Sequence, residues 1–175
     1  MRKILVVAYS YTGTARCLAQ MLCAQQGWPM AEVVDVRPRS GFQGTARCVL
    51  DSMLRRAPPI RYEGPDPAGF DTVVLVAPIW MYRLAGPMRS FVAEHASSLP
   101  QVALLCTMGS AGAVNAVAEI GALLHRPPLL SLACTQRQVQ DGSCAATLRT
   151  LGTALQPGSA QESPGRPTSW SPRAA

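Results

Sequence analysis

The 175-residue sequence lacks the patterns that mark several classes of protein. Its apolar runs are all shorter than the roughly 18 residues that a membrane-spanning helix needs, and the first of them is too short for a secretion signal. The six cysteines form no C-x-x-C pair and have no zinc-ligand spacing with the two histidines. We therefore expect a cytoplasmic protein with no membrane segment and no metal site.

Charge and aromatic residues are also scarce. Charged residues make up 15% of the chain and aromatic residues 6%, with a formal net charge of +6 and a single lysine, Lys3. The arginines are scattered, and no basic stripe alternates with aromatic residues, so nucleic-acid binding is not expected. The sequence also has no P-loop, catalytic triad or carboxylate pair, and it predicts no catalytic side chain.

Short apolar runs alternate with helical patterns along most of the chain. This alternation predicts an α/β fold, a doubly wound three-layer sandwich around a five-stranded parallel sheet. The order 2-1-3-4-5 is the commonest arrangement of five such strands and is the order that we expect. The predicted strands are Ile4–Ala8, Glu32–Val36, Thr72–Ala77, Val102–Cys106 and Leu129–Ala133. The predicted helices are Gly13–Gln25, Thr45–Arg56, Pro87–Ala96, Ala113–Leu124 and Ser143–Leu155.

The composition changes near the carboxyl end of the sequence. Residues 1–155 carry the alternating pattern and are predicted to form one domain. Residues 156–175 are rich in Pro, Gly and Ser and have little to bury, so they are predicted to be a disordered tail.

A hydroxyl-rich turn joins the first predicted strand to the first predicted helix. It contains Ser10, Thr12 and Thr14 around a single glycine, Gly13. The amino end of a helix offers backbone N–H groups and the positive end of the helix dipole, which together bind anions. Serine and threonine also cap helices, so the alternative is that Thr12 is only a cap.

Two further loops are expected at the same edge of the sheet. Ligands of open parallel sheets bind outside the carboxyl ends of the strands, where the strand order reverses. The loops there are Ser10–Ala15, Ala77–Gly86 and Thr107–Gly112. The second carries the large aromatic residues Trp80 and Tyr82, and the third is built of small residues. A planar ring with a phosphate tail would suit this combination.

The three loops carry a family resemblance. Ser10-x-Thr12-Gly13, Pro78-Ile79-Trp80 and Cys106-Thr107-Met108-Gly109 resemble the flavodoxin-like family, in register over residues 2–155. The resemblance implies a bound FMN and electron transfer through it. The residues that it implies at the phosphate are Ser10, Tyr11, Thr12, Gly13, Thr14 and Ala15. Those implied on one side of the ring are Pro78, Ile79, Trp80, Met81 and Tyr82, and on the other side Thr107, Met108, Gly109 and Gly112.

The sequence departs from the family pattern at two of these positions. Ala15 stands where the family commonly has threonine, so Ala15→Thr is expected to tighten FMN binding. Tyr82 stands where the family often has glycine, and a peptide flip is harder there because of the Cβ. Arg83 lies in the second loop and Arg89 shortly after it, so both are close to the expected position of the ring. They are expected to stabilise the reduced ring and make its potential less negative, to attract nicotinamide phosphates, or to be solvated surface.

Three functions remain open at this point. The first is an FMN-dependent electron carrier that works with a redox partner protein. The second is an enzyme on the same fold, an NAD(P)H-dependent flavin or quinone reductase. The third is a degenerate module that no longer binds FMN. The sequence leaves open whether the protein is an enzyme and whether it is a monomer or a homodimer.

Overall fold

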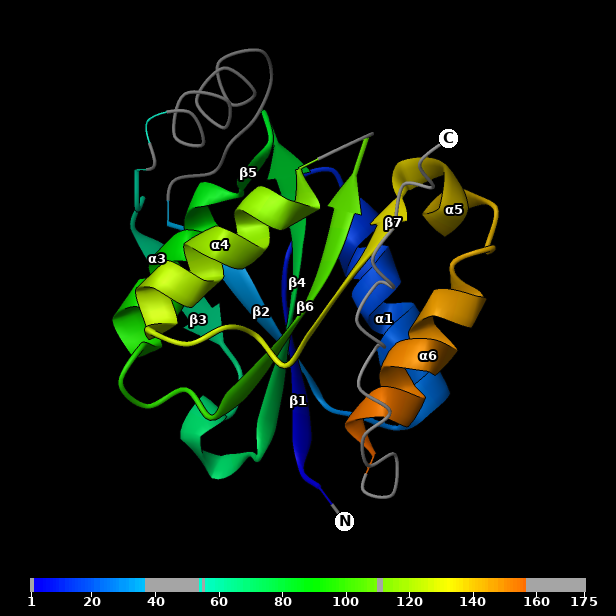
Figure 1. Cartoon of the computed structure of the whole chain (residues 1–175), viewed down its shortest axis with the longest axis horizontal. Helices are drawn as coiled ribbons and strands as arrows, with labels where there is room; N and C mark the ends of the chain where they lie inside the picture. Colours follow the sequence, from blue (N-terminus) through cyan, green and yellow to red (C-terminus); the bar gives the residue numbers. More distant parts are fainter. Residues whose placement is uncertain (1, 37–53, 55, 110–111, 157–175) are drawn as a thin grey trace, which may run out of the picture.

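The structure is a computed structural model that describes residues 2–36, 54, 56–109 and 112–156. Within these ranges the strands form one sheet in the order β3-β2-β1-β4-β6-β7, with β5 paired to β4 (Figure 1). The strands are β1 (Ile4–Tyr9), β2 (Met30–Asp35), β3 (Ile60–Glu63), β4 (Thr72–Trp80), β5 (Arg83–Leu84), β6 (Gln101–Met108) and β7 (Leu130–Thr135). The predicted helix Thr45–Arg56 lies almost wholly outside the described residues, and so does the predicted tail beyond Gln156.

The five predicted strands are present and parallel. They correspond to β2-β1-β4-β6-β7, which confirms the predicted order 2-1-3-4-5. The strand β3 was not predicted, and it pairs antiparallel with β2, with Val33 opposite Tyr62. It is a four-residue edge strand that carries charged side chains, and such a segment is too short to show a clear period.

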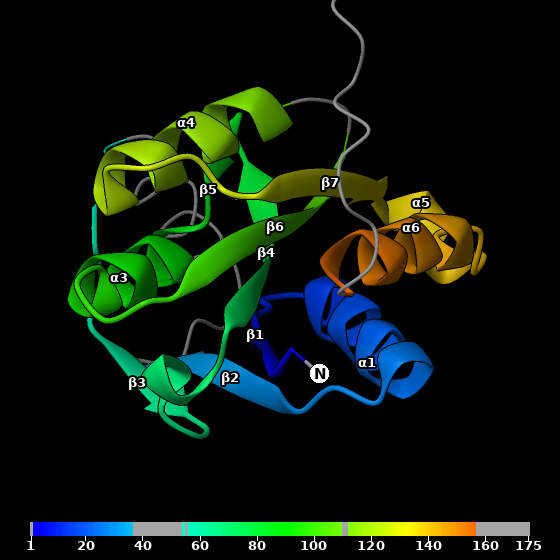
Figure 2. The ribbon, with the colours of Figure 1, turned by 60° about the horizontal axis from the view of Figure 1, so that its bottom comes forward.

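The helices cover both faces of the sheet. Figures 1 and 2 show α3 and α4 on one face, and α1, α5 and α6 on the other. The helices are α1 (Thr14–Gln26), α3 (Gly86–His95), α4 (Ala113–Leu124), α5 (Gln136–Gln140) and α6 (Ala145–Leu155). None of the described helices is both long and apolar enough to cross a bilayer.

The core forms two layers because successive strand side chains point to opposite faces of the sheet. In β4, Val73 and Leu75 pack in the layer under α3 and α4, whereas Val74 and Val76 pack in the layer under α1 and α6. All six residues of β1 are buried. Strands covered on both faces read as unbroken apolar runs, which is why the sequence revealed them.

The short helix α5 was not predicted, although the sequence carries its signal. Thr135 and Gln138 form a reciprocal capping box at its amino end. A threonine followed three residues later by glutamine is the sequence mark of this motif. The helix continues directly from β7, and it therefore places Gln136 at the edge of the sheet where the three loops lie.

Candidate functional site

The first helix begins in a turn that leaves its amino end without a side-chain cap. Gly13 is the N-cap, with φ 91°, and no side chain of the described residues makes a capping hydrogen bond. The Gly13 N–H donates to Ser10 Oγ at 3.0 Å, and the hydroxyls of Thr12 and Thr14 lie 3.4 Å apart. The alternative in which Thr12 merely caps the helix is therefore wrong. The turn sets three hydroxyls around a helix amino terminus.

Ala15 lies in the same turn, and its side chain belongs to the core. It is 1% exposed and packs in the core layer with Leu18, Ala19 and Leu22. The prediction that Ala15→Thr tightens FMN binding stays a prediction, and the burial of the position adds the expectation that a larger side chain there lowers stability. Only the backbone of Ala15 belongs to the turn.

The three predicted loops meet around a shallow depression of about 80 Å³. Its lining comes from the hydroxyl turn, from the ends of β4 and β6, and from the start of α5. The lining residues are Thr12, Thr14, Pro78, Ile79, Thr107, Met108, Gly109 and Gln136. Gln136 was missed in the sequence. It follows the strand next to β6, and the rule that ligands bind beyond the strand ends would have included it.

A second hollow of about 210 Å³ lies on the other side of the hydroxyl turn. It is lined by Tyr9, Ser10, Tyr11, Arg16, Val33, Val34 and Asp35. Both hollows are smaller than the 300–1,000 Å³ that is usual for small-molecule pockets. Each can therefore accept only part of a ligand the size of a nucleotide.

Thr107 is the most unusual residue of the depression. It is 5% exposed and lines the depression, and its hydroxyl makes no hydrogen bond to any of the described residues. A buried hydroxyl without a partner costs roughly 1–3 kcal/mol, so native structures contain few of them. A ligand in the depression could supply the missing partner, which makes Thr107 a residue expected to bind.

Aromatic residues from the first two loops pack against each other. The Trp80 ring meets Tyr9 and Tyr11 edge-on, with ring centroids 6.1 Å and 5.8 Å apart. The Tyr9 hydroxyl donates to Asp35 Oδ2 at 2.8 Å. These contacts fix Trp80 at the point where β1 and β4 end. One side of the crevice between the three loops is therefore rigid.

The β4–β5 hairpin turns through two residues in the left-handed region, Met81 (φ 47°) and Tyr82 (φ 61°). This conformation costs an ordinary residue roughly 1–2 kcal/mol. Gly112, with φ 115°, lies against the tip, and a Cβ on it would come within 2.8 Å of Ile79 Cγ2 and of the Tyr82 Cα. The second and third loops are thus in direct contact.

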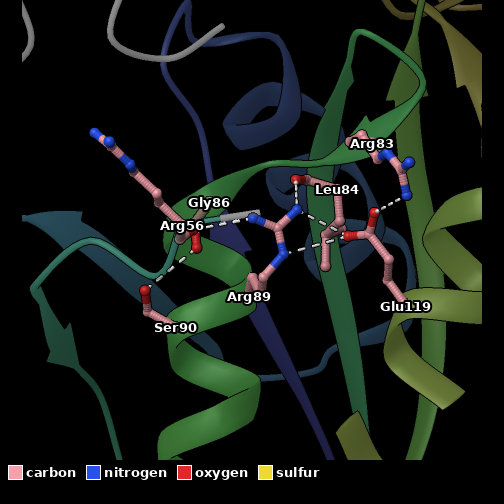
Figure 3. A network of polar contacts seen from close by, with 7 residues as sticks. All are labelled: Arg56, Arg83, Leu84, Gly86, Arg89, Ser90 and Glu119. Carbon is pink, nitrogen blue, oxygen red and sulfur yellow. Dashed lines mark hydrogen bonds and ion pairs between the residues drawn. The ribbon is translucent and has the colours of Figure 1, made fainter. Parts of the chain in front are cut away.

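Arg83 in the second loop and Arg89 just after it lie in one polar network (Figure 3). Arg89 is 6% exposed, and its Nη2 lies 2.8 Å from Glu119 Oε2 and donates to the Leu84 carbonyl at 2.9 Å. Arg83 Nη1 lies 3.3 Å from Glu119 Oε1. Arg89 is thus not solvated surface, and the shared carboxylate offsets part of the positive charge. The expected shift to a less negative potential stays a prediction, and Glu119, which no local pattern connects with the two arginines, acts against it.

The cysteine at the end of β6 is inert. Burial raises the pKa of Cys106 from 9.0 to about 12, so its thiol stays protonated at neutral pH. A protonated thiol is a poor nucleophile. The depression therefore holds hydrogen-bonding and apolar groups and offers no activated cysteine from this strand.

Comparison with known proteins gives structural matches only. No family model matches the sequence, and no curated protein does. A flavoprotein from Lactobacillus acidophilus NCFM, solved in complex with FMN, matches with a TM-score of 0.67 and 17% identity over 82% of this chain and 99% of the other.

Two further solved structures match less closely. RosB with bound 8-demethyl-8-formylriboflavin-5'-phosphate matches with a TM-score of 0.55 and 11% identity, over 87% of this chain and 77% of the other. The flavodoxin, WrbA-like protein from Agrobacterium tumefaciens matches with a TM-score of 0.51 and 11% identity, over 86% and 99%. At such identities the likeness establishes the fold. This chain has the flavodoxin-like fold, with an added antiparallel strand at its edge.

Proposed function

We propose that the protein binds FMN in the crevice formed by its three loops and transfers electrons through the bound flavin. The observation that carries this proposal is the depression itself. An uncapped helix amino end, the hydroxyls of Thr12 and Thr14 and the buried hydroxyl of Thr107 surround it. A phosphorylated ligand would satisfy all of these donors, because a phosphate has several acceptor oxygens and ribityl hydroxyls can pair with Thr107.

The residues present fit the two ends of FMN. The hydroxyl turn would hold the phosphate, with Ser10, Thr12 and Thr14 donating beside the helix N–H groups. Trp80 and the hairpin tip would cover one side of the flavin ring, and the loop after β6 the other. The bound flavin supplies the redox chemistry, whereas the protein supplies binding and orientation.

Two of the structural matches add support of a limited kind. One was solved with FMN and another with a phosphorylated flavin analogue, as stated above. The electron donor is proposed to be a redox partner protein or NAD(P)H. Steady-state oxidation of NADPH with a quinone acceptor would favour the reductase, and reduction only through a partner protein would favour the carrier.

Binding of FMN and riboflavin by the ligand-free protein tests the proposal, with flavin fluorescence as the signal. We expect FMN to bind more tightly than riboflavin, because only FMN reaches the hydroxyl turn with a phosphate. Thr12→Val should weaken FMN binding and leave riboflavin binding unchanged, since the Thr12 side chain is exposed and lies at the turn. A wild-type protein that binds neither flavin would refute the proposal and favour a module that has lost FMN.

Thr107→Val tests the buried hydroxyl, and we expect it to weaken FMN binding without lowering the stability of the protein. Valine has nearly the shape of threonine, so the variant removes a buried group that has no hydrogen-bond partner among the residues that the structure describes. We expect FMN affinity to fall by about three- to tenfold, the value of one hydrogen bond, while the free energy of unfolding stays the same or rises. Thr107→Ser keeps the hydroxyl and serves as the control. A loss of stability without a loss of affinity would show that Thr107 is only a core residue.

A further inference from the structure

The tip of the β4–β5 hairpin holds a conformation that its residues do not favour. Two-residue hairpin loops with both residues in the left-handed region usually carry asparagine or glycine, and here they carry Met81 and Tyr82. These residues are 53% and 57% exposed, so packing of their side chains does not hold the tip. The contacts that hold it must lie at the base of the hairpin or beside it.

Ion pairs at the base of the hairpin tie it to the neighbouring helices. Arg83, the residue after the tip, pairs with Glu119 of α4, and Arg89 of α3 pairs with the other oxygen of the same carboxylate (Figure 3). Arg89 also donates to the carbonyl of Leu84, the second residue of β5. Glu119 is therefore the group that both arginines of the hairpin base share.

The helix α4 contacts the hairpin at a second point. Gly112, the N-cap of α4, lies against the backbone of Tyr82 so closely that a Cβ would not fit. Glu119 lies seven residues further on, about two turns along the helix, and hence on the same side. One helix thus holds the hairpin at its tip through Gly112 and at its base through Glu119.

We propose that Glu119 is a positioning residue for the flavin site. It holds Arg83 and Arg89, and through them it keeps the hairpin tip in the left-handed conformation that presents Met81 and Tyr82 to the flavin ring. Glu119 itself does not contact the ligand. This proposal rests on the proposed function, since the tip has a ligand-facing role only if a flavin occupies the crevice.

This role predicts a loss of flavin affinity that differs from the loss expected when the hydroxyl turn is changed. If the tip contacts the ring, a variant that disturbs the tip should weaken the binding of FMN and of riboflavin equally, because both carry the same ring. A residue at the phosphate should affect FMN alone. The ratio of the two dissociation constants therefore separates the hairpin from the turn, and a general loss of folding would appear in thermal unfolding.

Arg83→Met is the main variant, because it leaves the buried Arg89–Glu119 pair intact. We expect FMN and riboflavin affinities to fall together by about tenfold, or about 1.4 kcal/mol. Arg61→Met is the matched control, since Arg61 pairs with Glu63 on the surface of β3, away from the crevice. FMN and riboflavin affinities that match those of the wild type, or that fall no further than in Arg61→Met, would overturn the proposal.

Glu119→Gln tests the positioning residue directly, with amide hydrogen exchange of the ligand-free protein as the readout. We expect exchange at residues 81–85 to be at least tenfold faster than in the wild type, with Arg61→Met unchanged. If the variant unfolds, Arg83→Met gives the same readout with a smaller change. Unchanged exchange in the hairpin would overturn the proposal. If the wild-type protein binds no flavin but Glu119→Gln still speeds exchange in the hairpin, only the proposed function is refuted.

Discussion

Replacing Gly112 by alanine should destabilise the protein more than replacing any glycine that needs only its backbone freedom. Gly112 has φ 115°, and an added Cβ would lie 2.8 Å from both Ile79 Cγ2 and the Cα of Tyr82. The left-handed backbone alone costs alanine about 1–2 kcal/mol. Contact with a backbone atom cannot be relieved by a side-chain rotation, and such overpacking adds about 1–3 kcal/mol. We therefore expect a loss of about 2–5 kcal/mol in the free energy of unfolding.

Gly27→Ala is the matched control. Gly27 caps the carboxyl end of α1 with φ 71°, and no atom of the described part of the chain lies within 4 Å of the position that its Cβ would take. Only the backbone cost of about 1–2 kcal/mol applies there. Urea unfolding measures both variants, and each kcal/mol corresponds to about 2–4 °C in Tm for a domain of this size. Equal losses in the two variants would refute the steric reasoning, and with it the close contact between the loop after β6 and the hairpin tip.

Two further predictions concern buried positions. Ala15→Thr should lower the free energy of unfolding by about 1–3 kcal/mol in urea, because the site is 1% exposed and closely packed; tighter FMN binding at unchanged stability would contradict the placement of Ala15. Burial raises the pKa of Cys106 to about 12, so the thiol ionises first in the unfolded chain. The stability due to this shift is complete below about pH 9 and falls by up to about 1.4 kcal/mol per pH unit as the pH rises towards 12. Cys106→Ala should flatten this part of the urea-derived profile, and an unchanged slope would show that Cys106 is not its source.

Much of the fold could be predicted because the central strands are buried on both faces. Ile4–Tyr9 and Thr72–Ala77 carry unbroken apolar runs, and such runs are visible without any knowledge of their neighbours. The edge strand Ile60–Glu63 was missed for the opposite reason. It is stabilised by pairing with β2, and its own four residues carry charges that resemble those of a loop.

The candidate site, like the fold, could be predicted only in part. The three loops could be located because the ends of parallel strands lie at one edge of a sheet, and the depression joins residues from all of them. The direction of each side chain could not be predicted. Ala15 was assigned to the turn by its position in the chain, but the first turn of α1 points its side chain into the core.

The sequence by itself determined the parallel sheet and the position of the hydroxyl turn, because these depend on local periodicity, whereas the order of the five strands was expected only as the commonest one. Only the tertiary structure decided which groups act together. Glu119 lies 36 residues from Arg83 and 30 from Arg89, and no local pattern connects them. The packing of α4 beside the hairpin brings the carboxylate to both guanidinium groups. Arg83 and Arg89, which on the sequence alone could be solvated surface, therefore pair with Glu119 at the base of the hairpin beside the site.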